Sequence, residues 1–118
     1  MYIVKGDLGL LFISFDDFRR QAKQMPRLTR EAEKECAATM AQGDPAARDR
    51  LIASYLPFVA SVLGKAPRQI QTLNTVYCAV AALEKGIDTF DFQQDSERFS
   101  HHLSWRMRQC IARCIADQ

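Results

Sequence analysis

The chain has 118 residues, of which 47% are hydrophobic, so it can bury the core of one ordinary globular domain. Its 16 basic and 14 acidic side chains give a formal net charge of +2, which does not by itself indicate a nucleic-acid partner. The apolar run from Leu8 to Ile13 is too short to span a bilayer. Composition therefore argues against a membrane protein and leaves the partner to be inferred from local patterns.

The N-terminal part, residues 1–25, is expected to be an extension that contains one short helix. Its first thirteen residues show no pattern that favours one state. Ser14 can cap a helix that carries Asp16 and Asp17 in its first turn, and Pro26 ends that helix.

Residues 26–118 are expected to form one helical domain. Thr29 caps a helix that runs to about Gln42, with Gly43 at its C-terminus. Asp44 and Pro45 then supply an acidic N-cap and a proline at the first helical position of the next helix.

Two longer helices follow, each with apolar residues at helical spacing. Pro57 should bend or briefly interrupt the first of them, and a polar loop around Arg68 to Gln71 precedes the second, which Thr72 or Asn74 caps. The stripe of the first helix comprises Leu51, Ile52, Tyr55, Leu56, Val59, Val62 and Leu63. The stripe of the second comprises Leu73, Val76, Tyr77, Val80, Leu83 and Ile87. Since no segment alternates with period two, the sequence predicts an all-α bundle of four or five helices.

The last helix, Arg98 to Ile115, has two different faces, and Phe90 to Glu97 form the turn that leads into it. The helix contains four arginines and no acid, whereas residues 88–97 contain four acids and no base. Its apolar stripe comprises Phe99, Leu103, Met107, Cys110, Ile111, Cys114 and Ile115, and its polar face comprises His102, Trp105, Arg106, Gln109 and Arg113. Either this polar face binds a partner such as a nucleic acid, or Trp105 packs beneath the N-terminal segment.

Four cysteines, at positions 36, 78, 110 and 114, have helix-like spacing, and the chain shows no signal peptide, which fits reduced thiols in a cytoplasmic protein. Cys110 and Cys114 lie one helical turn apart near His101 and His102, but no C-x-x-C pair accompanies them. We therefore expect these sulfurs to pack as small hydrophobes, and we predict no metal and no cofactor.

Catalytic motifs are absent from the sequence. It contains no phosphate-binding glycine loop and no nucleophile elbow, and its five glycines are scattered. A thiol nucleophile such as Cys78 would need a distant histidine beside it. The sequence therefore predicts a protein that is not an enzyme, with a metal-dependent or thiol enzyme as a minor alternative.

From Pro26 to the end, the order of features resembles the RNA polymerase sigma factors of the sigma-seventy family, over their regions one-point-two and two. The segments that carry the resemblance are LTREAEKECAATMAQGDPAARDRLIASYLPFVASVLGK, ALEKGIDTFD and RFSHHLSWRMRQCIARCI. The resemblance implies an all-helical bundle that binds the clamp helices of the polymerase's largest subunit and reads the minus-ten promoter element.

The resemblance also implies which residues of the last helix face promoter DNA. Trp105 would be the wedge or stacking residue, and Gln109 would read a base in the upstream duplex. The family usually has tyrosine and tryptophan where this chain has His102 and Arg106. The implied DNA-binding set is Phe99, His102, Trp105, Arg106, Arg108, Gln109 and Arg113.

The helix that binds polymerase in the family is the most divergent part. In the family this helix usually begins with acidic and amide side chains, and the equivalent positions here are the run Asn74 to Ala79. The implied polymerase-binding residues are Asn74, Tyr77 and Cys78, and a thiol at 78 cannot pair with a clamp arginine as a carboxylate does. The alternative function is therefore a sigma-fold interaction module or regulator that has lost polymerase or DNA binding.

The family continues into a linker and a domain that binds the minus-thirty-five element. The present sequence stops where the family would continue. We therefore expect either an excised domain or one part of a split sigma factor whose partner supplies the minus-thirty-five contacts.

Overall fold

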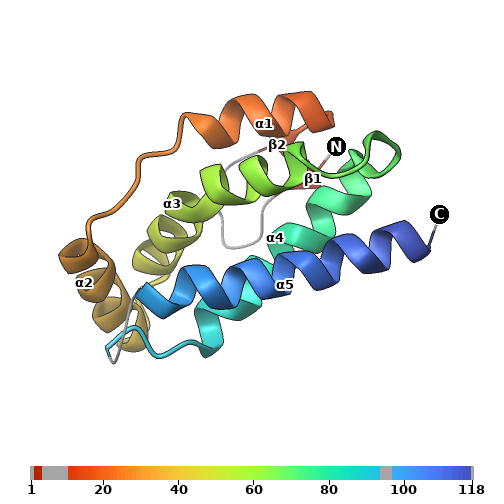
Figure 1. The fold of residues 1–118 in the computed structure, drawn as a ribbon. Coiled ribbons are helices and arrows are strands. Elements are labelled where there is room, and N and C mark those ends of the chain that lie inside the picture. Colours follow the sequence, from red (N-terminus) through yellow and green to blue (C-terminus); the bar gives the residue numbers. More distant parts are fainter. Residues whose placement is uncertain (1, 4–10, 94–96, 118) are drawn as a thin grey trace.

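The computed structural model describes residues 2–3, 11–93 and 97–117, and within these ranges the protein is an all-α bundle (Figure 1). Its five α-helices are α1 (Phe15–Lys23), α2 (Arg30–Ala41), α3 (Pro45–Gly64), α4 (Leu73–Thr89) and α5 (Glu97–Ala116), with a short 3₁₀ turn, η1 (Arg68–Ile70), before α4. Two-residue strands, β1 (Tyr2–Ile3) and β2 (Leu11–Phe12), pair antiparallel with Tyr2 opposite Phe12. The predicted fold class is confirmed.

Side-chain caps begin the first four helices where the sequence predicts them. The backbone N–H of Asp17 donates to Ser14 Oγ at 3.0 Å, and that of Ala32 donates to Thr29 Oγ1 at 3.1 Å. Equivalent bonds join the N–H of Ala46 to Asp44 Oδ1 at 3.0 Å and the N–H of Thr75 to Thr72 Oγ1 at 3.4 Å. Of the two predicted caps for α4, Thr72 is therefore the one used.

The turn between α2 and α3 depends on Gly43, whose φ of +97° lies in the left-handed region. Glycine adopts this conformation without the steric cost that a Cβ atom imposes. Three residues therefore suffice to connect the two helices, and the last of them, Asp44, caps α3.

Helix α3 is the centre of the bundle and packs against each of the other four helices. It continues through Pro57 as one helix, so of the two predicted effects of this proline, a bend or a brief interruption, the interruption does not occur. A proline inside a helix costs about 3 kcal/mol. The fully buried Leu56 and Val59 on either side of it hold the helical path by their packing, which offsets that cost.

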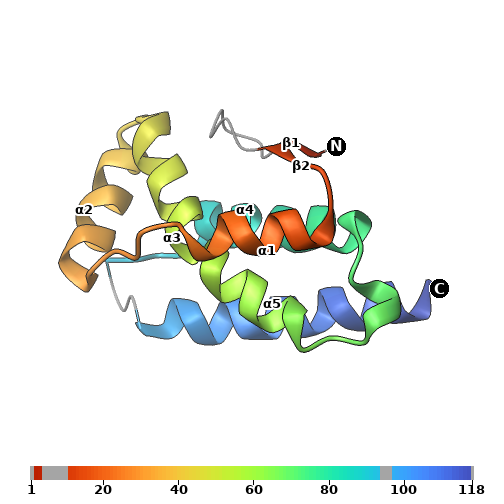
Figure 2. The same cartoon turned by 90° about the horizontal axis from the view of Figure 1, so that it is seen from above.

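Helix α1 shares the core with the helices that follow it. Phe15 and Phe18 are buried and pack edge to face with ring centroids 6.5 Å apart, and Phe18 meets Phe12 at 5.1 Å. In Figure 2, α1 lies across α3 on the side opposite to α5. The polar turn predicted over residues 93–97 falls partly outside the described residues.

Three residues differ from the predicted pattern of burial. Tyr77, expected in the α4 stripe, is 41% exposed. Its neighbour Val76 is fully buried, and Tyr77 lies about 100° around the helix from Val76. Ile115 is 47% exposed because it lies in the last turn of α5. Conversely, the loop residue Ile70 is buried, since η1 packs against α5.

No helix in the described part of the chain is both long enough and apolar enough to cross a membrane.

An ion-pair cluster joins α3 to α4. Arg48 Nε donates to Asp88 Oδ1 at 2.7 Å and its Nη2 donates to Asp88 Oδ2 at 3.0 Å, while Nη2 lies 3.4 Å from Glu84 Oε2. The hydrogen bond to Asp88, above all, raises the pKa of Arg48. Since Glu84 is only 7% exposed, this guanidinium balances a carboxylate inside the bundle.

We expect Arg48→Ala to lower the free energy of unfolding by about 1–3 kcal/mol, because Glu84 and Asp88 lose their charged hydrogen-bond donor. Urea unfolding followed by circular dichroism measures the change. The control is Arg50→Ala, which removes an exposed cation from the same helix and should change stability by less than about 0.5 kcal/mol. Equal effects of the two substitutions would contradict this role for Arg48.

Candidate nucleic-acid interface

Helix α5 buries the stripe that its periodicity predicts. Phe99, Leu103, Met107 and Cys110 are buried, whereas Ile111 and Cys114 are half-buried. The opposite face is exposed to solvent, and Trp105 on that face is 54% exposed. Of the two interpretations of this face, packing of Trp105 beneath another segment is therefore wrong for the described structure.

Phe99 lies on the buried side and has no exposed surface. Its ring packs against Tyr55 at 4.8 Å, Phe92 at 4.9 Å and Phe90 at 5.2 Å between centroids. A fully enclosed ring cannot stack on a nucleic-acid base. In this conformation Phe99 is a core residue, and we exclude it from the candidate interface, which corrects its place in the predicted DNA-binding set.

His102 and Arg106 form a hydrogen-bonded pair one helical turn apart. Arg106 Nε donates to His102 Nε2 at 2.8 Å, and the imidazole also lies 5.9 Å from the ring of Phe90. Burial first, and the charge of Arg106 second, lower the pKa of His102. The pair therefore consists of a neutral imidazole that accepts and a guanidinium that stays charged, with both side chains half-buried.

A groove of about 420 Å³ runs between α4 and α5 beside this pair. It is lined by Cys78, Ala81, Ala82 and Lys85 of α4 and by Arg106, Gln109, Cys110 and Arg113 of α5. Three of these side chains are cations, and the small Ala81 and Ala82 leave the space open. Lys85 was missed by the sequence reasoning, because only the packing of α4 against α5 brings it beside the arginines.

Gln109 joins this groove to the outer surface of α5. It lies one helical turn from the exposed Trp105, and Arg108 is exposed next to it. We call Trp105, Arg106, Arg108, Gln109 and Arg113 the α5 face. It combines an aromatic ring, an amide and three permanent cations, and no acidic residue occurs between Phe99 and Ala116. Such a surface can bind phosphates, stack on bases and donate to base edges.

The predicted polymerase-binding residues lie near the start of α4. Asn74 and Tyr77 are exposed, whereas Cys78 is half-buried and turns its sulfur toward α5. The structure thus separates Cys78 from the other two, which face solvent.

The lowered pKa of His102 predicts a pH dependence of stability. Below the usual histidine value of about 6.5, the unfolded chain takes up a proton more readily than the folded one. The stabilising contribution is therefore complete above pH 6.5 and declines as the pH falls through the folded pKa.

Proton NMR titration of the two histidines, assigned with His101→Gln, should give a midpoint below 6.5 for His102. Arg106→Gln should raise that midpoint by removing the neighbouring charge. A midpoint at or above 6.5 in the unsubstituted protein would contradict the neutral imidazole.

Comparison with proteins of known function finds a relative among transcription factors. The chain is 31% identical over 111 residues to RNA polymerase sigma factor SigA of Clostridium acetobutylicum. The alignment covers 90% of this chain and 29% of that protein, so the chain spans less than a third of the relative's length. No model of a known protein family matches. Over nearly its whole length, this chain is therefore similar to one segment of an RNA polymerase sigma factor, which confirms the resemblance predicted from its motifs.

Proposed function

We propose that this chain acts in transcription initiation as a sigma-type module, in which the α5 face binds the minus-ten region of promoter DNA. The observation that supports this most directly is the 54% exposure of Trp105, beside Gln109, on a helix whose other side is buried. The similarity to a sigma factor gives this surface its expected ligand. This role involves binding and no catalysis, and it would place the chain in the cytoplasm.

Each part of the α5 face has a suitable task in this proposal. The indole of Trp105 would stack on an unpaired base or wedge against the end of the duplex, an interaction typically worth about 1–3 kcal/mol per base. The amide of Gln109 can bond to an adenine edge in the major groove. Arg108 and Arg113 would contact phosphates, which makes the affinity depend on salt.

His102 and Arg106 contribute differently from the tyrosine and tryptophan of the family. Arg106 donates to His102, and this hydrogen bond holds the guanidinium, which lines the α4–α5 groove. We propose that Arg106 supplies charge to a phosphate rather than an aromatic surface to a base. Lys85 and Arg113 would add to the same positive potential.

We expect Trp105→Ala and Gln109→Ala each to weaken binding to a single-stranded minus-ten oligonucleotide or its duplex–single-strand junction by about 5- to 100-fold. Fluorescence anisotropy measures the affinity at a fixed salt concentration. Tyr77→Ala is the matched control, because it removes an exposed aromatic ring from α4 and should leave DNA binding unchanged. Equal binding by the unsubstituted protein and all three variants would contradict the proposed role of the α5 face in DNA binding.

The salt dependence separates phosphate contacts from base contacts. Arg113→Ala should reduce the slope of log affinity against log salt by roughly one, since one phosphate contact is lost. Gln109→Ala should leave that slope unchanged while lowering discrimination among sequences. A slope that Arg113→Ala does not alter would place the phosphate contacts elsewhere.

We also propose that the exposed start of α4, with Asn74 and Tyr77, contacts RNA polymerase core. A single small module rarely buries enough surface for tight specific binding to DNA, so the proposal includes core and a separate protein that supplies minus-thirty-five contacts.

One observation favours a second function. Asn74 and Tyr77 present an amide and an aromatic ring where the resemblance implies an acidic and an amide contact, which suits an interaction module that binds another transcription protein. Capture of polymerase core from purified components decides between the two. If the protein captures core stoichiometrically and Tyr77→Ala weakens that capture, the sigma-type role is supported. If the protein does not capture core, the interaction module is favoured, whether or not DNA binding is retained.

A further inference from the structure

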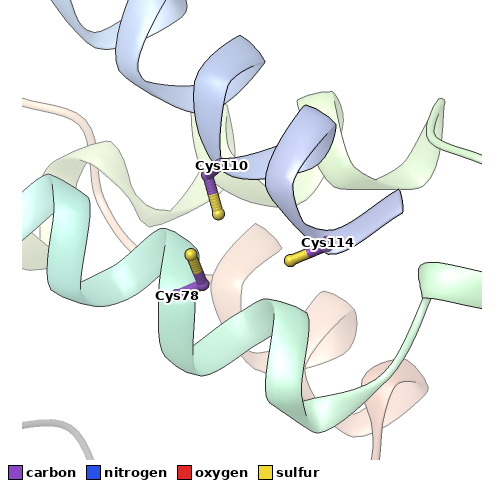
Figure 3. A group of neighbouring side chains, drawn as sticks. All are labelled: Cys78, Cys110 and Cys114. Atoms are coloured by element: carbon purple, nitrogen blue, oxygen red, sulfur yellow. The ribbon is translucent and has the colours of Figure 1, made fainter. Parts of the chain in front are cut away.

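Three cysteines form a cluster between α4 and α5. The sulfur atoms of Cys78, Cys110 and Cys114 all lie within 4.8 Å of one another. Figure 3 shows Cys78 on α4 and the other two on α5, with all three sulfurs directed into the same space between the helices. Cys110 is buried and the other two are half-buried, so the cluster is enclosed on one side and accessible on the other.

These distances suit a metal bound by sulfur. With metal–sulfur bonds of about 2.3 Å, three thiolates of a tetrahedral site lie roughly 3.8 Å apart. The sulfurs therefore need to approach one another by only about 1 Å, which small rotations of cysteine side chains provide. The donor set consists of sulfur alone, which favours soft or borderline ions such as Zn²⁺ and Cu⁺ over Mg²⁺ or Ca²⁺.

The surroundings also fit a thiolate site. Cys78 and Cys110 line the α4–α5 groove together with Lys85, Arg106 and Arg113. A divalent ion with three thiolates carries a net charge of −1, and these three cations lie on the walls of the same groove and offset it. The groove also gives a water molecule or an external ligand access to a fourth coordination position.

We propose that Cys78, Cys110 and Cys114 form a metal site that binds one Zn²⁺, or a similarly thiophilic ion, through three thiolates, with the fourth position open to the α4–α5 groove. Binding releases the protons of thiols that are protonated in the metal-free protein. Burial and the two neighbouring thiols raise the pKa of Cys110, so this thiol keeps its proton until a metal displaces it.

The metal would tie α4 to the last two turns of α5. This end of the helix is less buried than its middle, since Cys114 is half-buried and Ile115 is 47% exposed. A metal that bridges Cys78 to Cys110 and Cys114 would hold in place the turns of α5 that carry Gln109 and Arg113. The site itself depends only on the three sulfurs and stands whether or not the α5 face binds DNA.

The test is metal binding by the reduced, metal-free protein under anaerobic conditions. Titration with Zn²⁺ against a chromophoric chelator should give one ion per chain. Titration with Co²⁺ should give the intense near-ultraviolet sulfur-to-metal absorption and the visible bands of a tetrahedral thiolate site.

Cys78→Ser and Cys114→Ser remove the two half-buried ligands, and each should weaken Zn²⁺ binding at least 10-fold and reduce the Co²⁺–thiolate absorption. Cys36→Ser is the matched control, because Cys36 is a buried cysteine of α2 outside the cluster, and it should bind Zn²⁺ as the unsubstituted protein does. Circular dichroism verifies that each variant remains helical. The fully folded, unsubstituted protein gives the stoichiometry even if a variant fails to fold.

Three results would overturn the proposal. The first is no Zn²⁺ binding by the reduced protein at micromolar concentrations. The second is binding that Cys78→Ser and Cys114→Ser leave unchanged. The third is formation of a disulfide within the cluster in air, combined with no metal uptake by the reduced form, which would make the cluster a redox pair instead.

Discussion

The enclosure of Phe99 sets the rotation of α5 about its own axis, and the exposed surface of the molecule depends on that rotation. The ring is held by Tyr55 from α3 and by Phe90 and Phe92 from the segment that leads into α5, so three aromatic contacts converge on it. A helix turns about 100° per residue, so Trp105, six positions later, lies roughly 120° around the helix from Phe99. With Phe99 turned into the core, Trp105 therefore lies on a different face of α5, and no other segment of the described structure covers it. Tyr55 is itself fixed, because its hydroxyl donates to Glu33 Oε1 at 2.6 Å and thus links α3 to α2.

The same packing of α4 against α5 creates both surfaces to which we assign binding. Arg106 and Arg113 lie between the exposed Trp105 side and the groove that reaches the cysteine cluster. Their charges favour phosphate on the outside and thiolate-bound metal on the inside by the same electrostatic attraction. A change that separates α4 from α5 would consequently affect both surfaces together. The small side chains of Ala81 and Ala82 on α4 leave open the groove between α4 and α5.

The two departures from the family pattern in α5 act as one feature. His102 and Arg106 stand where the resemblance implies two aromatic residues, on which bases could stack. The hydrogen bond of 2.8 Å between them holds a permanent cation at the edge of the groove. A substitution at only one of the two positions would lose that bond.

The sequence by itself determined the local structure, because helix caps and apolar spacing act over a few residues. Ser14, Thr29 and Asp44 cap helices as predicted, and the periodicity of α5 identified the burial of Leu103 and Met107. The motifs were also sufficient to indicate the relationship to sigma factors. Pro57 shows the limit of local rules, since core packing keeps α3 continuous through it.

Only the tertiary structure decided which distant residues meet, since contact between α4 and α5 depends on how whole helices pack. It placed Lys85 beside Arg106 and brought Cys78 to Cys110 and Cys114, although the sequence predicted no metal site from the cysteines of α5. It also decided between two expectations for Phe99, since periodicity placed this ring on the buried stripe and the resemblance placed it among the DNA-binding residues. The physical reason is that spacing along one helix defines its faces, whereas the neighbouring helices decide which of those faces reach solvent.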